Sequence, residues 1–147
     1  MSKNVFAYIL ALILIFFLAW IIFNQVKEKH LQTDPILYVL KETLRPVKYN
    51  GKSIVENLKL YKGDKSYTIN KDKTFLCLYD DKNEYYPLNM LIYVLLHEIS
   101  HSLNTKDIGH TEEFYRIFDI LLKQAEQTGA YNPSIPVIQN YCNSDRE

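Results

Sequence analysis

The sequence predicts an α+β protein in which an N-terminal transmembrane helix precedes one compact domain. Three observations support this: a long uncharged apolar run near the N-terminus, short extended segments bounded by turn residues, and two helical patterns in the second half. We expect a small, mostly antiparallel sheet packed on the first of these two helices, with the second helix towards the C-terminus. The expected domains are residues 1–30, an anchor with its juxtamembrane segment, and residues 31–147.

The apolar run "VFAYILALILIFFLAWIIF", Val5–Phe23, contains no charged residue. At the rise of an α-helix it spans roughly 28 Å, close to the hydrocarbon thickness of a bilayer. It is too long and too uniformly apolar for a core helix, and no small-residue cleavage site precedes "NQVKEKH", as a signal peptide would require. We therefore expect a single-pass membrane protein with a lipid-embedded anchor. Lysines are more frequent after the run than before it, which mildly favours a cytoplasmic folded domain.

The charge balance argues against a nucleic-acid-binding protein, and the cysteine count argues against a cysteine-based framework or zinc site. The 17 basic residues balance 17 acidic ones, whereas proteins that grip nucleic acid normally carry a basic surplus. No nucleic-acid partner is expected. Cys77 and Cys142 are too few and too far apart for a disulfide framework or a CxxC zinc site. Cys77 lies in the apolar stretch "TFLCLY", which favours a buried free thiol, although a single bridge between the two cysteines stays open.

The first part of the domain combines a helix with three strands. In "TDPILYVLKETLRP", Asp34 is the expected N-cap, Pro35 takes the first helical position and Pro46 ends the helix. Turn residues then separate three extended segments. These segments are Ile54–Tyr61, Ser66–Asn70 and Thr74–Tyr79.

Two helices form the second part of the domain. The first, in "YPLNMLIYVLLHEISHSL", begins at Pro87 or Leu88 and is apolar nearly all round, so it should be buried. Asn104 can end it in a left-handed conformation. Thr111 can cap the second helix, and Gly129 ends it. The proline-punctuated tail "YNPSIPVIQNYC" is expected to be extended and docked.

His97 and His101 lie in the first of these helices, four residues apart, among its apolar residues. Their rings leave one face of the helix a turn apart, which lets two imidazoles share one zinc ion. Glu98 is displaced by about 100° around the helix, beside such an ion rather than on it. There it can act as general base towards a water that zinc has acidified. The pattern predicts a zinc site with Glu98 as the catalytic residue.

A catalytic zinc needs a third protein ligand and an open position. His110 is the expected third ligand, because Gly109 before it permits an unusual turn that brings the ring to the start of the next helix. Glu112 and Glu113 are the alternatives, since carboxylates fill this role in some zinc sites.

The succession "HEISH" and "GHTEEF" resembles the minimal zincin metallopeptidases of the SprT and WLM type. Their signature is HExxH on a buried helix, followed by a short loop and a G-H-x-x-x-F helix start. The resemblance runs from about Ser66 to Leu122 and includes the strand pair in "SYTINKDKTFLCLYD". It implies the same three histidine ligands and the same general base. The whole chain also resembles small zincin-like proteins of large DNA viruses.

We therefore expect a membrane-anchored zinc endopeptidase that acts on a protein or peptide substrate, with Thr74–Tyr79 as the strand that pairs with it. SprT and WLM relatives often act on DNA–protein crosslinks, but the balanced charge and the anchor depart from that pattern. The competing hypothesis is a zinc-stabilised structural or adaptor module, for instance in a viral membrane. In that case Cys142 would close the fourth coordination position and Glu98 would be dispensable.

Overall fold

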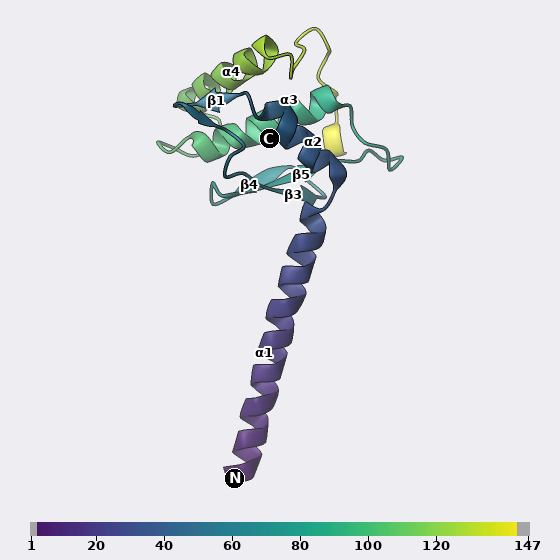
Figure 1. Cartoon of the computed structure of the whole chain (residues 1–147), viewed down its shortest axis with the longest axis vertical. Coiled ribbons are helices and arrows are strands. Elements are labelled where there is room, and N and C mark those ends of the chain that lie inside the picture. The colour runs from purple at the N-terminus through teal and green to yellow at the C-terminus, as the bar shows by residue number, and fades with distance from the viewer. Residues whose placement is uncertain (1–2, 144–147) are drawn as a thin grey trace. The chain divides into compact units, whose positions relative to one another are not determined.

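The computed structural model describes residues 3–143 of the chain. Its architecture is α+β: the described residues contain four α-helices, two small sheets and one short 3-10 helix (Figure 1). The chain divides into a helical unit that ends at Thr33 and a folded domain that begins at Asp34. The predicted fold class is confirmed at this level.

Helix α1, Lys3–Gln32, contains the whole apolar run. Its segment Asn4–His30 is 27 residues long, has a mean hydropathy of 3.0 in its apolar window, and is long and apolar enough to cross a membrane. None of that window is buried. The expected span, Val5–Phe23, lies inside α1, and the helix continues well beyond Phe23.

Helix α2, Pro35–Leu44, forms where the sequence predicts it. The Asp34 side chain accepts a hydrogen bond from the backbone N–H of Ile36 at 3.2 Å, and Pro35 takes the first helical position. The helix buries Leu37, Leu40 and Leu44 in the core.

Two small sheets form the β part of the domain. One is a hairpin of β1 (Lys48–Tyr49) and β2 (Lys52–Ser53), which turns at Asn50 and Gly51, both with positive φ. The other has the strand order β3-β5-β4. Its strands are β3 (Lys59–Gly63), β4 (Tyr67–Ile69) and β5 (Lys73–Cys77).

The expectation of a mostly antiparallel sheet is wrong for the three-stranded sheet. Strand β5 pairs antiparallel with β4, but it pairs parallel with β3 over a longer register. The first predicted strand also began too early, because residues 54–58 lie before β3. The backbone of β3 comes close to its neighbours at Gly63, where a Cβ would lie within 2.8 Å of the Lys65 carbonyl oxygen and 3.0 Å of the Phe75 Cβ. The glycine lets the chain bend tightly out of β3 and leave the neighbouring position to β5.

Helix α3, Leu88–Leu103, is the centre of the domain. It packs against α2, α4, β4 and β5, and it lies between the sheet and α4 (Figure 1). Helix α4, Glu112–Gln127, begins behind the N-cap Thr111 as predicted, and Gly129 follows its end with a φ of +75°. These contacts fix which face of α3 is left for the site.

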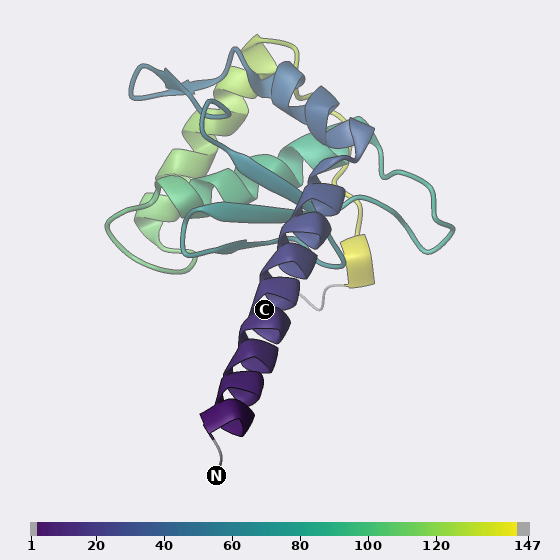
Figure 2. The same ribbon diagram turned by 60° about the horizontal axis from the view of Figure 1, so that its bottom comes forward.

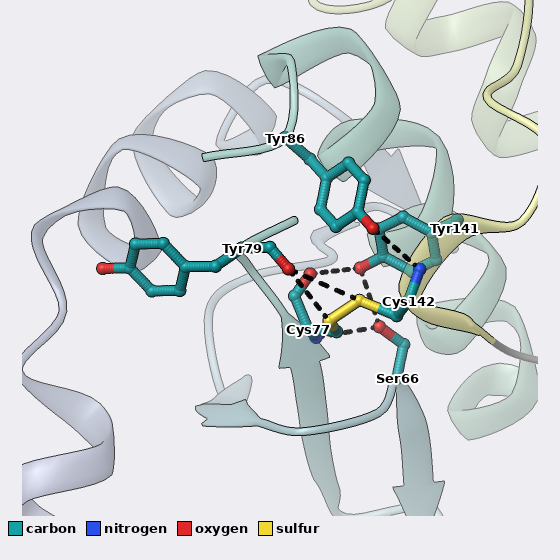
Figure 3. Close-up of a disulfide and its surroundings, with 6 residues drawn as sticks. All are labelled: Ser66, Cys77, Tyr79, Tyr86, Tyr141 and Cys142. Atoms are coloured by element: carbon teal, nitrogen blue, oxygen red, sulfur yellow. Dashed lines mark hydrogen bonds between the residues drawn. A yellow bond between two sulfur atoms is a disulfide. The ribbon is translucent and has the colours of Figure 1, made fainter. Parts of the chain in front are cut away.

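The C-terminal segment docks on the domain, as expected, and its described part closes with the 3-10 turn η1, Tyr141–Asn143, drawn in yellow in Figure 2. Cys142 in this turn forms a disulfide with Cys77 at the end of β5, with their Cα atoms 6.3 Å apart (Figure 3). The preferred interpretation of Cys77 as a free thiol is therefore wrong. The open alternative, a single bridge across 65 residues of sequence, is what the fold contains.

Candidate metal centre

A cleft of about 790 Å³ runs along one face of α3. Along this helix, positions three and four apart share a face. Its lining residues on α3 follow that spacing: Met90, Tyr93, Val94, His97, Glu98 and His101. The segment from Ser66 to Lys71, which contains β4, lines the cleft too, and the loop before α4 contributes His110.

The three predicted ligands converge in this cleft. The Nε2 atoms of His97 and His101 lie 3.3 Å apart, those of His101 and His110 3.2 Å apart, and those of His97 and His110 3.0 Å apart. Two nitrogens that bind one tetrahedral zinc ion at about 2.05 Å each lie about 3.3 Å from one another. The donor set and its spacing therefore fit a zinc ion.

Phe114 explains why the rings converge. It is fully buried in the first turn of α4, and its ring centroid lies 4.9 Å from that of His97, 4.4 Å from His101 and 4.8 Å from His110. One aromatic ring thus forms an apolar floor under all three imidazoles. Burial also lowers the pKa of His101, with further contributions from His110 and Lys71, and a neutral imidazole is the form that binds metal.

Glu98 lies beside the histidine cluster and not in it. The residue is 7% exposed and lines the same cleft. The Thr68 hydroxyl on β4 donates a hydrogen bond of 2.9 Å to its Oε2 and one of 3.2 Å to its backbone oxygen. Burial raises the pKa of Glu98 to about 7, against the opposing effect of the Thr68 hydrogen bond. A carboxyl group with such a pKa can both accept and return a proton near neutral pH.

The loop that carries His110 is ordered by a set of polar contacts, here called the loop network: Asn104, Asp107, Thr111 and Lys71. The Asn104 side-chain oxygen accepts bonds from the backbone N–H groups of Lys106 and Asp107 at 3.2 and 3.3 Å. Its amide donates to the Asp107 carboxylate, which also accepts a bond of 2.6 Å from the Thr111 hydroxyl. Thr111 in turn caps α4, so the network links the ends of both helices.

Lys71 completes the loop network from the β4–β5 turn. Its ammonium donates to the backbone oxygens of Asn104 and Asp107, in the second case at 3.0 Å. Sequence reasoning missed Lys71 and Thr68, because both act across the fold. It also missed Asp107, although its partners Asn104 and Thr111 lie only three and four residues away. The expectation of a left-handed Asn104 is wrong: the residue has a φ of −74°, and α3 ends there in an extended backbone whose N–H donates to the Ser100 carbonyl. The unusual turn at Gly109 is present, with a φ of +89°.

Glu113, one of the two alternative carboxylate ligands, has other partners. Glu113 binds Arg116 through two contacts of 2.8 Å and Lys106 at 3.3 Å, and these cations lower its pKa to about 2. Among the described residues, the His, Cys, Asp and Glu side chains close enough to share one ion are the three histidines. Cys142 also lines the cleft, but its sulfur is bonded to Cys77. It is therefore not free to close a fourth position.

No protein-family model and no solved structure matches the chain. Two viral proteins are similar in sequence. Uncharacterized protein 136R of Invertebrate iridescent virus 6 is 45% identical over 98 residues, which cover 65% of this chain and 54% of the relative. Uncharacterized protein 042R of Invertebrate iridescent virus 3 is 43% identical over 94 residues, which cover 63% of this chain and 58% of the relative. The chain spans little more than half the length of these curated relatives.

Proposed function

We propose that this protein is a membrane-anchored zinc metallopeptidase that cleaves peptide bonds within a polypeptide substrate. One observation carries the proposal: three imidazole nitrogens at zinc-ligand spacing and a buried carboxylate face one open cleft. This combination goes beyond a structural zinc site, which has four protein ligands and no need of a neighbouring base. The resemblance to zincin metallopeptidases agrees with the proposal.

In the proposed reaction, the metal ligands, Glu98 and Thr68 have separate roles. The three histidines would hold the zinc ion, which would supply Lewis acidity towards a carbonyl group and a water molecule. Glu98 takes the proton of the attacking water and returns it to the amine that leaves. Thr68 holds Oε2 of this carboxylate, so that Oε1 is left for the proton. The apolar surroundings keep competing water away from the carboxylate.

Strand β4 is the better candidate for holding the substrate. Thr74–Tyr79, the segment expected to do so, overlaps β5, which has a neighbour on each side. Strand β4 is an edge strand, and Tyr67 and Thr68 in it line the cleft. An extended peptide that adds to this edge would place its backbone along the cleft, beside Glu98.

The decisive experiment uses the zinc-loaded full chain in detergent, with casein as substrate. Glu98→Gln keeps the size of the side chain and removes the base, so about one zinc per chain should remain while cleavage falls about 10²- to 10⁴-fold. If wild type and variant cleave equally, the mechanism is wrong. If neither cleaves while both bind zinc, the structural or adaptor module becomes the better hypothesis.

Helix α1 is proposed to anchor the domain in a membrane. The Cys77–Cys142 disulfide favours an oxidising side for the domain, in place of the cytoplasmic side that lysine distribution mildly favours, because such bonds are rare in reducing cytosol. The full chain should stay in the membrane pellet after alkaline carbonate, and an added protease should reach the domain only from the oxidising side. Release of the intact chain by carbonate would refute the anchor.

A further inference from the structure

The cleft continues beyond the metal centre towards the N-terminal end of α3. Met90 lies seven residues before His97, about 10 Å along the helix axis. Tyr93 and Val94 lie between them on the same face. This part of the cleft is here called the uncharged sector, and it is completed by the start of β4 and by the C-terminal turn. Its lining residues are Ser66, Tyr67, Met90, Tyr93, Val94, Tyr141 and Cys142.

The two ends of the cleft differ in the charge of the side chains that line them. The ionisable side chains with a charge at neutral pH that line it outside the metal centre are Lys71 and Asp107, both beyond His101. The uncharged sector offers aromatic rings, a valine and a thioether instead. A charged substrate side chain would lose its water there without gaining a partner, whereas an apolar one gains contact area.

The C-terminal wall of this sector is held firmly. Tyr141 is 4% exposed, and its hydroxyl donates to the Cys77 backbone oxygen and lies 2.9 Å from the Ser66 hydroxyl oxygen (Figure 3). The Cys142 N–H donates to the Tyr86 hydroxyl at 2.9 Å. Cys142 itself has a φ of +51°, which is uncommon for a residue with a side chain, and its sulfur is bonded to Cys77. The disulfide therefore fixes the wall to the end of β5, a strand that packs against α3.

We propose that the uncharged sector is a side-chain subsite for a bulky apolar residue of the substrate, aromatic or long aliphatic, and that the disulfide-held tail is its specificity-determining wall. The proposal rests on the proposed function, since the subsite is continuous with the metal centre and β4. Met90, Tyr93 and Tyr141 contribute apolar surface to this lining, which suits an aromatic or aliphatic side chain. The subsite selects residues next to the scissile bond.

Its test is binding, which does not depend on turnover. Peptide hydroxamates that differ in one side chain (Phe, Leu, Ala, Lys or Asp), on either side of the zinc-binding group, are titrated into the zinc-loaded full chain and into Glu98→Gln. In one of the two series, Phe and Leu should bind about tenfold or more tightly than Ala, the discrimination expected of an apolar pocket, and Lys and Asp should bind more weakly still. Equal affinities in both series would overturn the subsite.

One variant and one matched control show which part of the cleft binds the substrate side chain. Tyr67→Lys places an ammonium at the exposed rim of the sector and should shift the preference of that series towards Asp. Tyr115→Lys, the same change at an exposed tyrosine that lines the cleft beside His110 and outside the sector, should leave the Asp-to-Phe affinity ratio as in wild type. An identical shift in both variants would place the side chain outside the sector.

The double variant Cys77→Ser, Cys142→Ser tests the wall. Its zinc content should stay at the wild-type level, because neither cysteine is a ligand, while the preference for Phe over Ala should fall at least fivefold. An unchanged preference with the bond absent would remove the disulfide from the proposal. Selective hydroxamate binding without casein cleavage would instead retain the subsite and reject the peptidase.

Discussion

Two of the three histidines are held by a helix and the third by a loop, and the two halves of the metal centre are built by different means. His97 and His101 are one turn apart on α3, so their common direction follows from helical geometry alone. His110 is exposed and has no helix to orient it. Its position depends on the loop network, in which Asp107 and Asn104 tie the end of α3 to the start of α4.

The comparison shows where the site is coupled to the rest of the fold. The helical half needs the core packing of α3, including the contact of both rings with Phe114 on α4. The loop half also needs Lys71, which reaches it from the turn between β4 and β5. A change in that turn should therefore reach the metal through His110 and leave the helical pair in place. Ligand and network substitutions can separate the two halves.

Removal of a ligand should have the largest effect. His101→Ala leaves one helical and one loop ligand, whereas His110→Ala leaves the helical pair, which is already in position. Zinc affinity should fall in both, and further in His101→Ala, with a lower melting temperature as the metal's contribution to folding is lost. The measurement is zinc per chain by elemental analysis, followed by thermal unfolding.

The fourth histidine provides the control, because His30 lies in α1 outside the folded domain. His30→Ala should bind zinc as the wild type does. Full zinc occupancy in His110→Ala would transfer the third-ligand role to Glu112 or Glu113 and end the comparison between helix and loop.

Disruption of the loop network should have an intermediate effect. Asp107→Ala removes the acceptor shared by Asn104 and Thr111 and should weaken zinc binding about 10- to 100-fold, the usual cost of losing a group that orients a metal ligand. Asp119→Ala is the matched control, since it removes an exposed carboxylate that pairs with Lys123 on α4. Competition with a zinc-binding dye gives both affinities. Equal losses would show that the network does not hold His110.

The same contrast describes what the sequence could predict. Patterns confined to neighbouring residues predicted α2 through Asp34 and Pro35, and the start of α4 through Thr111, because caps act over one helical turn. The spacing of four residues between His97 and His101 also predicted that the two side chains share one face of α3. Contacts between distant segments were missed, since no local pattern records them.

The errors have one physical source. The disulfide joins positions 65 residues apart, and the parallel pairing of β3 with β5 places β5 where a local hairpin would have placed β4. Both depend on which segments meet after the chain has folded. Gly63 is a partial signal, because a glycine within an extended segment often marks a close backbone approach.

Thr68→Val should have the smallest effect and tests whether the helical half is as independent as it looks. Thr68 is the one hydroxyl on β4 that contacts the Glu98 carboxylate in the described residues, and valine keeps its shape without the donor. Loss of one hydrogen bond to a carboxylate is worth about 1.5 kcal/mol, so kcat should fall about tenfold. Zinc affinity should not change, because Glu98 lies beside the metal ligands and not among them.

Three further measurements make this a test of positioning rather than of folding. Thr68→Ser restores a hydroxyl and should recover most of the lost kcat, while a purely structural role of the methyl group predicts no recovery. Thr43→Val removes a threonine hydroxyl that bonds the Val39 carbonyl within α2 and should leave kcat unchanged. KM should be similar in all of these variants, since the hydrogen bond orients the base and does not hold the peptide. A large rise in KM with an unchanged kcat would instead assign Thr68 to substrate binding at the β4 edge, and the carboxylate of the helical half would then need no partner outside α3.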